Sequence, residues 1–245
     1  MHLLFTVLAV VLLTVASAEV QASGDGFLFK PPSGTFALRG GLDRAQAGSD
    51  IFSFVTNELT LGRGDFRTFT LAGDFAYRMS PRVDIVVFSV ATARSSAPSE
   101  FRDFVDNNRR PIQQTTTFQR VPLTASVKTY FTNTGRLVGN FAWIPARYAP
   151  YVGAGGGAMW YRFRQEGDFI DFDTTRVFAD DFTSSGWTPT VQAFAGADIS
   201  LGPRWALTTE ARYQWAKARM SADFAGFDRI DLSGLAVTTG LTVRY

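Results

Sequence analysis

The sequence has no cysteine, a single histidine at position 2 and no block of like charges. Without cysteine, a disulfide framework and a lipid-modified N-terminal cysteine are excluded. The net charge is +2 with both signs scattered along the chain, so we expect no nucleic-acid partner. Long apolar runs are missing beyond the N-terminus, which excludes a bundle of membrane-spanning helices, since each needs about 20 apolar residues.

The one apolar run lies at the N-terminus, where Leu3–Val15 precedes Ala16-Ser17-Ala18. Such a segment followed by small residues is typical of a cleaved secretory signal peptide and is short for a membrane span. We therefore expect a signal peptide over residues 1–18, a periplasmic N-terminal segment over 19–33 and a barrel domain over 34–245. His2 is the only candidate for the positive charge that usually opens such a leader.

Beyond residue 34, apolar and polar side chains alternate in long segments. The clearest segment is 204–216, where Trp205, Leu207 and Trp215 share one face and Glu210 and Arg212 share the other. This period of two predicts strands. Eight segments are predicted, over 34–42, 66–79, 82–93, 115–132, 147–164, 187–201, 204–217 and 231–245.

A soluble sandwich or lipocalin-like barrel also alternates, so the faces must decide between a soluble and a membrane protein. The polar faces carry charges of both signs among small residues, which suits a narrow lumen. Trp205 and Trp215 stand about 25 Å apart along a tilted strand, the height of an apolar membrane band. We predict an all-β fold, a closed eight-stranded antiparallel up-and-down transmembrane β-barrel. Its aromatic girdle is predicted at Tyr77, Phe131, Trp205, Tyr213, Trp215 and Tyr245.

The connections between these segments differ in length. Ser80-Pro81 and Gly202-Pro203 read as tight turns, whereas long polar or mixed loops are predicted over 43–65, 94–114, 165–186 and 218–230. Residues 49–61 read as a short capped helix lying over the barrel mouth. The link 133–146 is long where a short turn belongs. The third strand alternates poorly after Asp84, which indicates a bulge.

The chain resembles the eight-stranded outer-membrane β-barrel superfamily that includes the OmpA transmembrane domain, OmpX and OmpW. The resemblance rests on the segment 150–157 (PYVGAGGG) and on the chain end. It implies a C-terminal signal for the barrel-assembly machinery, formed by Val237, Leu241, Val243 and Tyr245. It further implies a monomer in the cell outer membrane, in contact with membrane lipid and lipopolysaccharide. Unlike OmpA itself, no peptidoglycan-binding domain is expected after the last strand.

Catalytic chemistry finds little support in the sequence. Gly153-x-Gly155-x-x-Ala158 formally matches a dinucleotide fingerprint, but a strand-like segment follows where that motif needs a helix. Once the leader is removed no histidine remains, so a serine–histidine relay is excluded. We expect no enzyme, no cofactor and no metal site. Carboxylates in the loop 165–186, among them Asp168 and Asp181, fit either a calcium site or, as we favour, a solvated loop.

Charged residues on the polar faces form the candidate site. The predicted lumen network comprises Arg39, Asp74, Arg78, Asp84, Arg120, Lys128, Arg162, Arg164, Asp198, Glu210, Arg212 and Arg244. Such a predominantly basic lumen fits either a path for small anions or, as we favour, a salt-bridged core that fills the barrel. The expected function is a structural envelope role or a narrow passive path. Surface binding through the long loops and a small-molecule channel of the OmpW kind are the alternatives.

Overall fold

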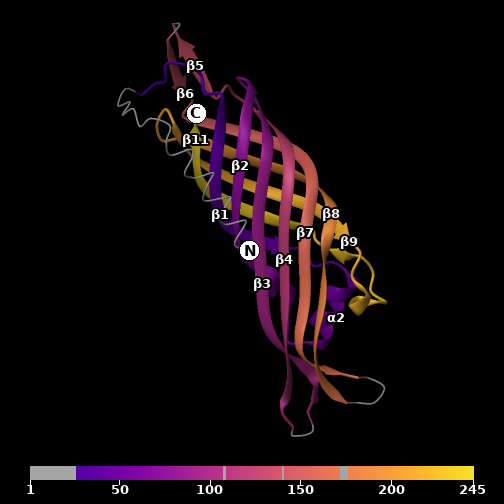
Figure 1. Cartoon of the computed structure of the whole chain (residues 1–245). Coiled ribbons are helices and arrows are strands. Elements are labelled where there is room, and N and C mark those ends of the chain that lie inside the picture. Colours follow the sequence, from indigo (N-terminus) through magenta and orange to yellow (C-terminus); the bar gives the residue numbers. More distant parts are fainter. Residues whose placement is uncertain (1–25, 107–108, 140, 172–175) are drawn as a thin grey trace.

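The chain folds into a closed barrel with a long extension at one end (Figure 1). The computed structural model describes residues 26–106, 109–139, 141–171 and 176–245, so the predicted signal peptide lies outside the described residues. The eight long strands are β1 (Gly34–Ala45), β2 (Arg67–Ser80), β3 (Val83–Val105), β4 (Pro111–Tyr130), β7 (Tyr148–Ile170), β8 (Val177–Ser200), β9 (Trp205–Ala218) and β11 (Gly234–Arg244). Each pairs antiparallel with two neighbours, and β1 joins β11 to close the ring. The predicted fold class is confirmed.

Apolar side chains cover the outside of the ring. Leu42, Val237 and Trp205 are 58, 49 and 49% exposed, whereas Arg39 and Glu210 are 2 and 3% exposed. Charged groups inside and bare apolar groups outside reverse the order of a soluble protein, and lipid is the solvent that such a surface requires. The alternation therefore builds a transmembrane barrel rather than a soluble one.

The predicted girdle and the predicted C-terminal signal lie on this outer surface. Side chains of Tyr77, Phe131, Trp205, Trp215 and Tyr245 are between 43 and 62% exposed. The Tyr213 ring lies beside that of Trp215, with centroids 4.6 Å apart. Val237, Leu241 and Tyr245 point outward, and Val243 is half-buried on the same face. Recognition of this strand by assembly machinery stays a prediction.

Two hairpins are longer than the sequence indicates. The predicted loops 94–114 and 165–186 are wrong for most of their length, because β3–β4 and β7–β8 continue as paired strands as far as Val105–Pro111 and Ile170–Val177. In Figure 1 they project well past the rest of the barrel. We call this the long-loop end, and the opposite end, with the turns at 81–82 and 201–204, the short-turn end. Apolar residues on the inner side of the hairpins hold them together.

The first long connection contains the predicted helix, α2 (Asp50–Glu58), followed by the short helix η1 (Arg63–Phe66). The last connection holds η2 (Ala222–Phe224) and the short strand β10 (Ile230–Asp231). Helix α2 lies at the long-loop end of the barrel, as the sequence indicated (Figure 1). In the described part of the chain, no helix is long and apolar enough to cross a membrane.

The exceptional link 133–146 is a small hairpin of β5 (Gly135–Val138) and β6 (Ala142–Pro145) at the short-turn end. Residue Leu28, ahead of the barrel, forms a bridge to Trp143 of this hairpin. The expected bulge is present, since the β3–β4 register shifts between Val86 and Ser89. Val87 and Phe88 both point outward there, which restores the inward direction at Ser89.

Candidate functional site in the barrel lumen

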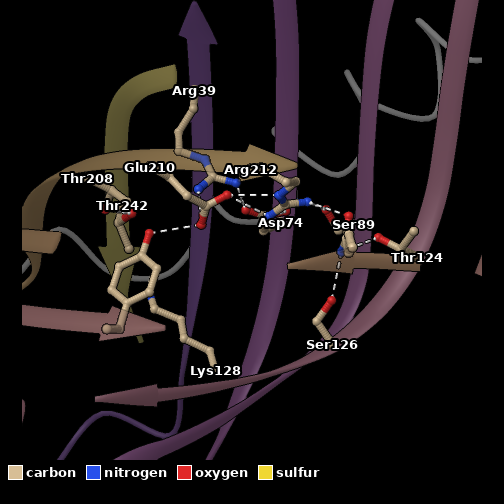
Figure 2. A network of polar contacts seen from close by, with 12 residues as sticks. Arg39, Asp74, Ser89, Thr124, Ser126, Lys128, Thr208, Glu210, Arg212 and Thr242 are labelled. Atoms are coloured by element: carbon tan, nitrogen blue, oxygen red, sulfur yellow. Dashed lines mark hydrogen bonds and ion pairs between the residues drawn. The ribbon is translucent and has the colours of Figure 1, made fainter. Parts of the chain in front are cut away.

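Four charged side chains meet at the centre of the lumen, and we call them the plug: Arg39 of β1, Asp74 of β2, and Glu210 and Arg212 of β9 (Figure 2). Arg39 is paired with Asp74, and its Nη1 lies 2.6 Å from Glu210 Oε2. Arg212 Nη2 lies 2.8 Å from Glu210 Oε1. All four are buried, and each charge has an opposite charge within contact, which is the condition for ions to be tolerated away from water.

Hydrogen bonds connect the plug to the opposite wall of the barrel. Arg212 Nη1 donates to Ser89 Oγ of β3 at 2.7 Å. Gln192 of β8 accepts from the same Nη1 at 3.4 Å and donates to Thr124 and Ser126 of β4, both at 2.8 Å. Figure 2 shows these contacts running across the cylinder between strands that are not neighbours. The plug therefore closes the lumen and also braces it.

A second charged layer lies toward the short-turn end. Lys128 Nζ is 3.1 Å from Asp198 Oδ2, and the Tyr130 hydroxyl donates to the same oxygen at 2.7 Å. Arg78 pairs with Asp84 through Nε at 3.0 Å. The ammonium of Lys128 also stands 3.7 Å from the centre of the buried ring of Tyr151. These rings and ions fill the cross-section between the plug and the short-turn end.

Toward the long-loop end, Arg120 seals the lumen. It pairs with Asp43 of β1, and its Nη1 donates to the carbonyl oxygen of Leu232 at 2.7 Å. One cavity of about 20 Å³ separates this layer from the plug, and another of the same size lies between the plug and Lys128. Each has room for about one water molecule. The lumen therefore has water-sized voids between its charged layers.

From Arg120 toward the long-loop end, large apolar side chains join the polar ones on the inner surface. On β4 the inward face passes from Lys128 and Arg120 to Phe118 and Ile112, and on β7 it reaches Tyr161 and Phe163. Helix α2 fills the space between them. We call this assembly of α2, η1, η2 and the extended hairpins the cap. Its buried core comprises Ala45, Ala47, Ile51, Phe52, Val55, Leu59, Leu61, Phe66, Ala97, Phe101, Ile112, Phe118, Met159, Tyr161, Phe163, Ile170, Ala216, Ala218, Phe224, Ile230 and Leu232.

The glycine-rich segment of β7 belongs to the barrel wall. Gly153, Gly155 and Gly157 lie within a continuous strand, so the helix that a dinucleotide site needs does not follow them. A Cβ atom at Gly153 would collide with the ring of Phe194, its register partner on the neighbouring strand β8. Close approach of neighbouring groups explains these glycines.

The structure places two members of the predicted network outside the lumen. Arg162 and Arg164 lie on the outer surface of the extended β7, because its inward positions are odd-numbered, as Tyr161 and Phe163 show. Arg162 lies over the ring of Trp160, and Arg164 pairs with Glu166 and Asp181. Hydrogen bonds from Arg164 hold the pKa of Asp181 below its ordinary value.

This correction changes the charge of the lumen. The remaining ten predicted residues are inside, and the structure adds Asp43, which the sequence analysis missed. Asp43 lies on the same face of β1 as Arg39, and the alternation in the sequence could have indicated this. Outside the cap, where Asp231 is also buried, the described part of the barrel interior thus holds six basic and five acidic side chains: Arg39, Arg78, Arg120, Lys128, Arg212, Arg244, Asp43, Asp74, Asp84, Asp198 and Glu210. A predominantly basic lumen is therefore ruled out.

Other polar groups that complete the network were also missed. Tyr130, Tyr151, Gln192 and Thr208 each donate to a charged or polar partner inside the barrel. Their phase along the strand could have placed them inward, but not their partners. In the described residues, no group of three or more histidine, cysteine or carboxylate side chains is placed to hold a metal ion.

No protein-family model matches the chain, and no curated protein matches it either. Among solved structures, Neisserial surface protein A is similar at 14% identity and a TM-score of 0.45, over 86% of this chain and 97% of that one. Ail, the attachment invasion locus protein of Yersinia pestis, is similar at 12% identity and a TM-score of 0.44, over 87% of this chain and 99% of that one. The N-terminal β-barrel domain of Pseudomonas aeruginosa OprF is similar at 11% identity and a TM-score of 0.33, over 87% and 99%. Similarity at this level carries no information on a ligand or a role.

Proposed function

We propose that the protein is an integral outer-membrane barrel with a closed lumen, acting as a non-enzymatic structural component of the cell envelope. In this proposal the short-turn end faces the periplasm and the cap lies outside the cell, because long connections belong on the outer side of such barrels. The observation that carries the proposal is the double closure of the lumen. Charge pairs block it at the membrane level, and an apolar core blocks its long-loop mouth.

The energetics favour a seal over a gated path. An ion passing the plug would have to separate Glu210 from Arg39 and Arg212, leaving buried charges without partners. It would next have to cross the cap, where Phe52, Phe118 and Phe163 pack with ring centroids 5.2–6.3 Å apart. The passive path, one of the two roles expected from the sequence, therefore finds less support than the structural role.

We expect purified protein refolded into planar bilayers to give no conductance steps. A matched variant in which Arg39, Asp74, Glu210 and Arg212 are all changed to serine, and residues 50–58 are replaced by a glycine–serine linker, removes the plug and the helix of the cap without leaving an unpaired charge in the plug. The layers around Arg120 and Lys128 stay in place, so this variant tests the plug and the cap alone. Steps from this variant and none from the unaltered chain would identify the seals. Reproducible steps from the unaltered chain would overturn the closed-lumen proposal.

A second candidate function is binding at the cell surface through the cap. The observation in its favour is that the outer parts of β3, β4, β7 and β8 form an ordered sheet with its own apolar core. A rigid platform of this kind loses little entropy when it meets a partner. Deleting residues 96–116, which form the outer β3–β4 hairpin, should abolish cell-surface binding while heat-modifiable gel migration persists.

A further inference from the structure

A hollow of about 570 Å³ lies at the short-turn end, between the β5–β6 hairpin, the β2–β3 turn and the segment before β1. Its walls are largely apolar and include Met79, Leu137 and Trp143, while Arg136 supplies positive charge and Arg78 lies in the wall paired with Asp84. The Nη1 atom of Arg78 has no hydrogen-bond partner among the described residues. The size and this mixture of apolar walls with a few polar groups are typical of small-molecule sites.

Apart from Asp84, which is paired with Arg78, the charged side chains around the hollow are basic. The short-turn end comprises residues 26–33, 79–83, 131–148 and 200–205, and its described residues include no aspartate or glutamate. The carboxyl group of the last residue, Tyr245, lies beside them. The basic side chains of this end are Lys30, Arg82, Arg136, Arg147 and Arg204. The long-loop end mixes both signs, so the asymmetry points to an anionic partner at this end alone.

The hollow is continuous with the lipid-facing wall. Met79, which lines it, is 64% exposed on the outer face of β2. Leu137, Val138 and Phe141 near the hairpin tip are 56, 48 and 76% exposed and leave an apolar surface uncovered. Arg147 and Arg204 directly precede the outward aromatics Tyr148 and Trp205, which is the level of the headgroups in a membrane. A ligand seated here would have its charged part in the hollow and its apolar part on the wall.

We propose that this hollow binds the headgroup of an anionic phospholipid of the inner leaflet, an inference that rests on the membrane placement proposed above. The phosphate contacts Arg136 and the neighbouring basic rim, and the acyl chains lie along Met79 and the outer face of β2. The β5–β6 hairpin supplies both a guanidinium and an apolar tip. This gives a role to the link whose length set it apart from the other turn at this end.

The test compares lipid retention by variants of the mature chain. Protein is refolded into phosphatidylcholine nanodiscs containing a minority of phosphatidylglycerol, and the lipids that stay bound after release into detergent are counted by native mass spectrometry. The unaltered chain should retain phosphatidylglycerol selectively. Changing Arg82, Arg136 and Arg147 to glutamine should lower that selectivity at least about fivefold, since one basic residue near an anionic surface contributes about that factor in affinity.

Two further variants keep the outcome interpretable. Arg63, Arg67 and Arg229 are exposed arginines of the long-loop end, and changing them to glutamine should leave retention unchanged. Changing Leu137 and Phe141 to serine should also weaken retention, whereas a site for free phosphate would not respond to that change. Heat-modifiable migration reports insertion separately, so a chain that inserts but retains both lipids equally overturns this inference and leaves the barrel assignment standing.

Discussion

Changing Glu210 to glutamine is expected to lower the free energy of unfolding by about 3–5 kcal/mol, the cost of removing one partner from a buried ion pair. Glu210 faces the guanidinium groups of both Arg39 and Arg212 and accepts a hydrogen bond from the Tyr151 hydroxyl at 2.9 Å. Without its charge, two buried cations share the single carboxylate of Asp74. Urea unfolding in detergent micelles, followed by tryptophan fluorescence, measures the change.

The matched control is Glu166 changed to glutamine. Glu166 also pairs with an arginine, Arg164, but on the outer side of the extended hairpin, where both side chains are about 40% exposed. Water and salt screen exposed pairs, so this variant should unfold close to the unaltered chain. Equal losses in the two variants would show that the lumen is wet enough to solvate Glu210, and the plug would then not be a seal.

The sequence was sufficient for the membrane part of the barrel because lipid imposes a strict contrast between the two faces of a strand. Leu207 and Leu241 must meet lipid while Glu210 and Arg212 must avoid it, and the alternation is therefore unbroken in β9 and β11. Beyond the membrane this constraint ends. Around Ala97 and Phe101 of β3 the outward face is polar and the inward face is mixed, so the extended hairpin reads as a loop.

The prediction that Arg162 and Arg164 face the lumen is wrong for a related reason. The run Gly153–Gly157 contains no side chain larger than alanine, so the phase of β7 cannot be followed across it from the sequence. Pairing with β4 decides the matter, because Phe118 and Phe163 are register partners and both face inward. The sequence also does not indicate which charged residues pair with each other. Asp43 and Arg120 are 77 residues apart, and only closure of the ring brings them together.

Changing Phe52 to alanine should open the cap and leave the barrel closed at the plug. The Phe52 side chain is fully buried, and its ring meets those of Phe66, Phe118 and Phe163 at centroid distances of 5.0, 5.2 and 5.7 Å. Removing such a ring from a packed core costs about 3–5 kcal/mol. A nine-residue helix is too short to persist without packing, so we expect α2 to detach. Thermolysin, which cleaves at apolar residues, should then cut within 50–61.

The control is Asn57, which is exposed on the opposite side of α2 and should tolerate alanine without added cleavage. If Phe52 to alanine leaves the helix resistant, the aromatic cluster does not hold the cap. If instead the variant also loses its heat-modifiable migration, cap and barrel fold as one cooperative unit. We expect neither result, because the ion pairs of the plug lie on the short-turn side of Arg120, and neither they nor the β1–β11 pairing that closes the ring involves α2. The two closures should therefore fail separately, the outer one by loss of packing and the inner one by loss of charge.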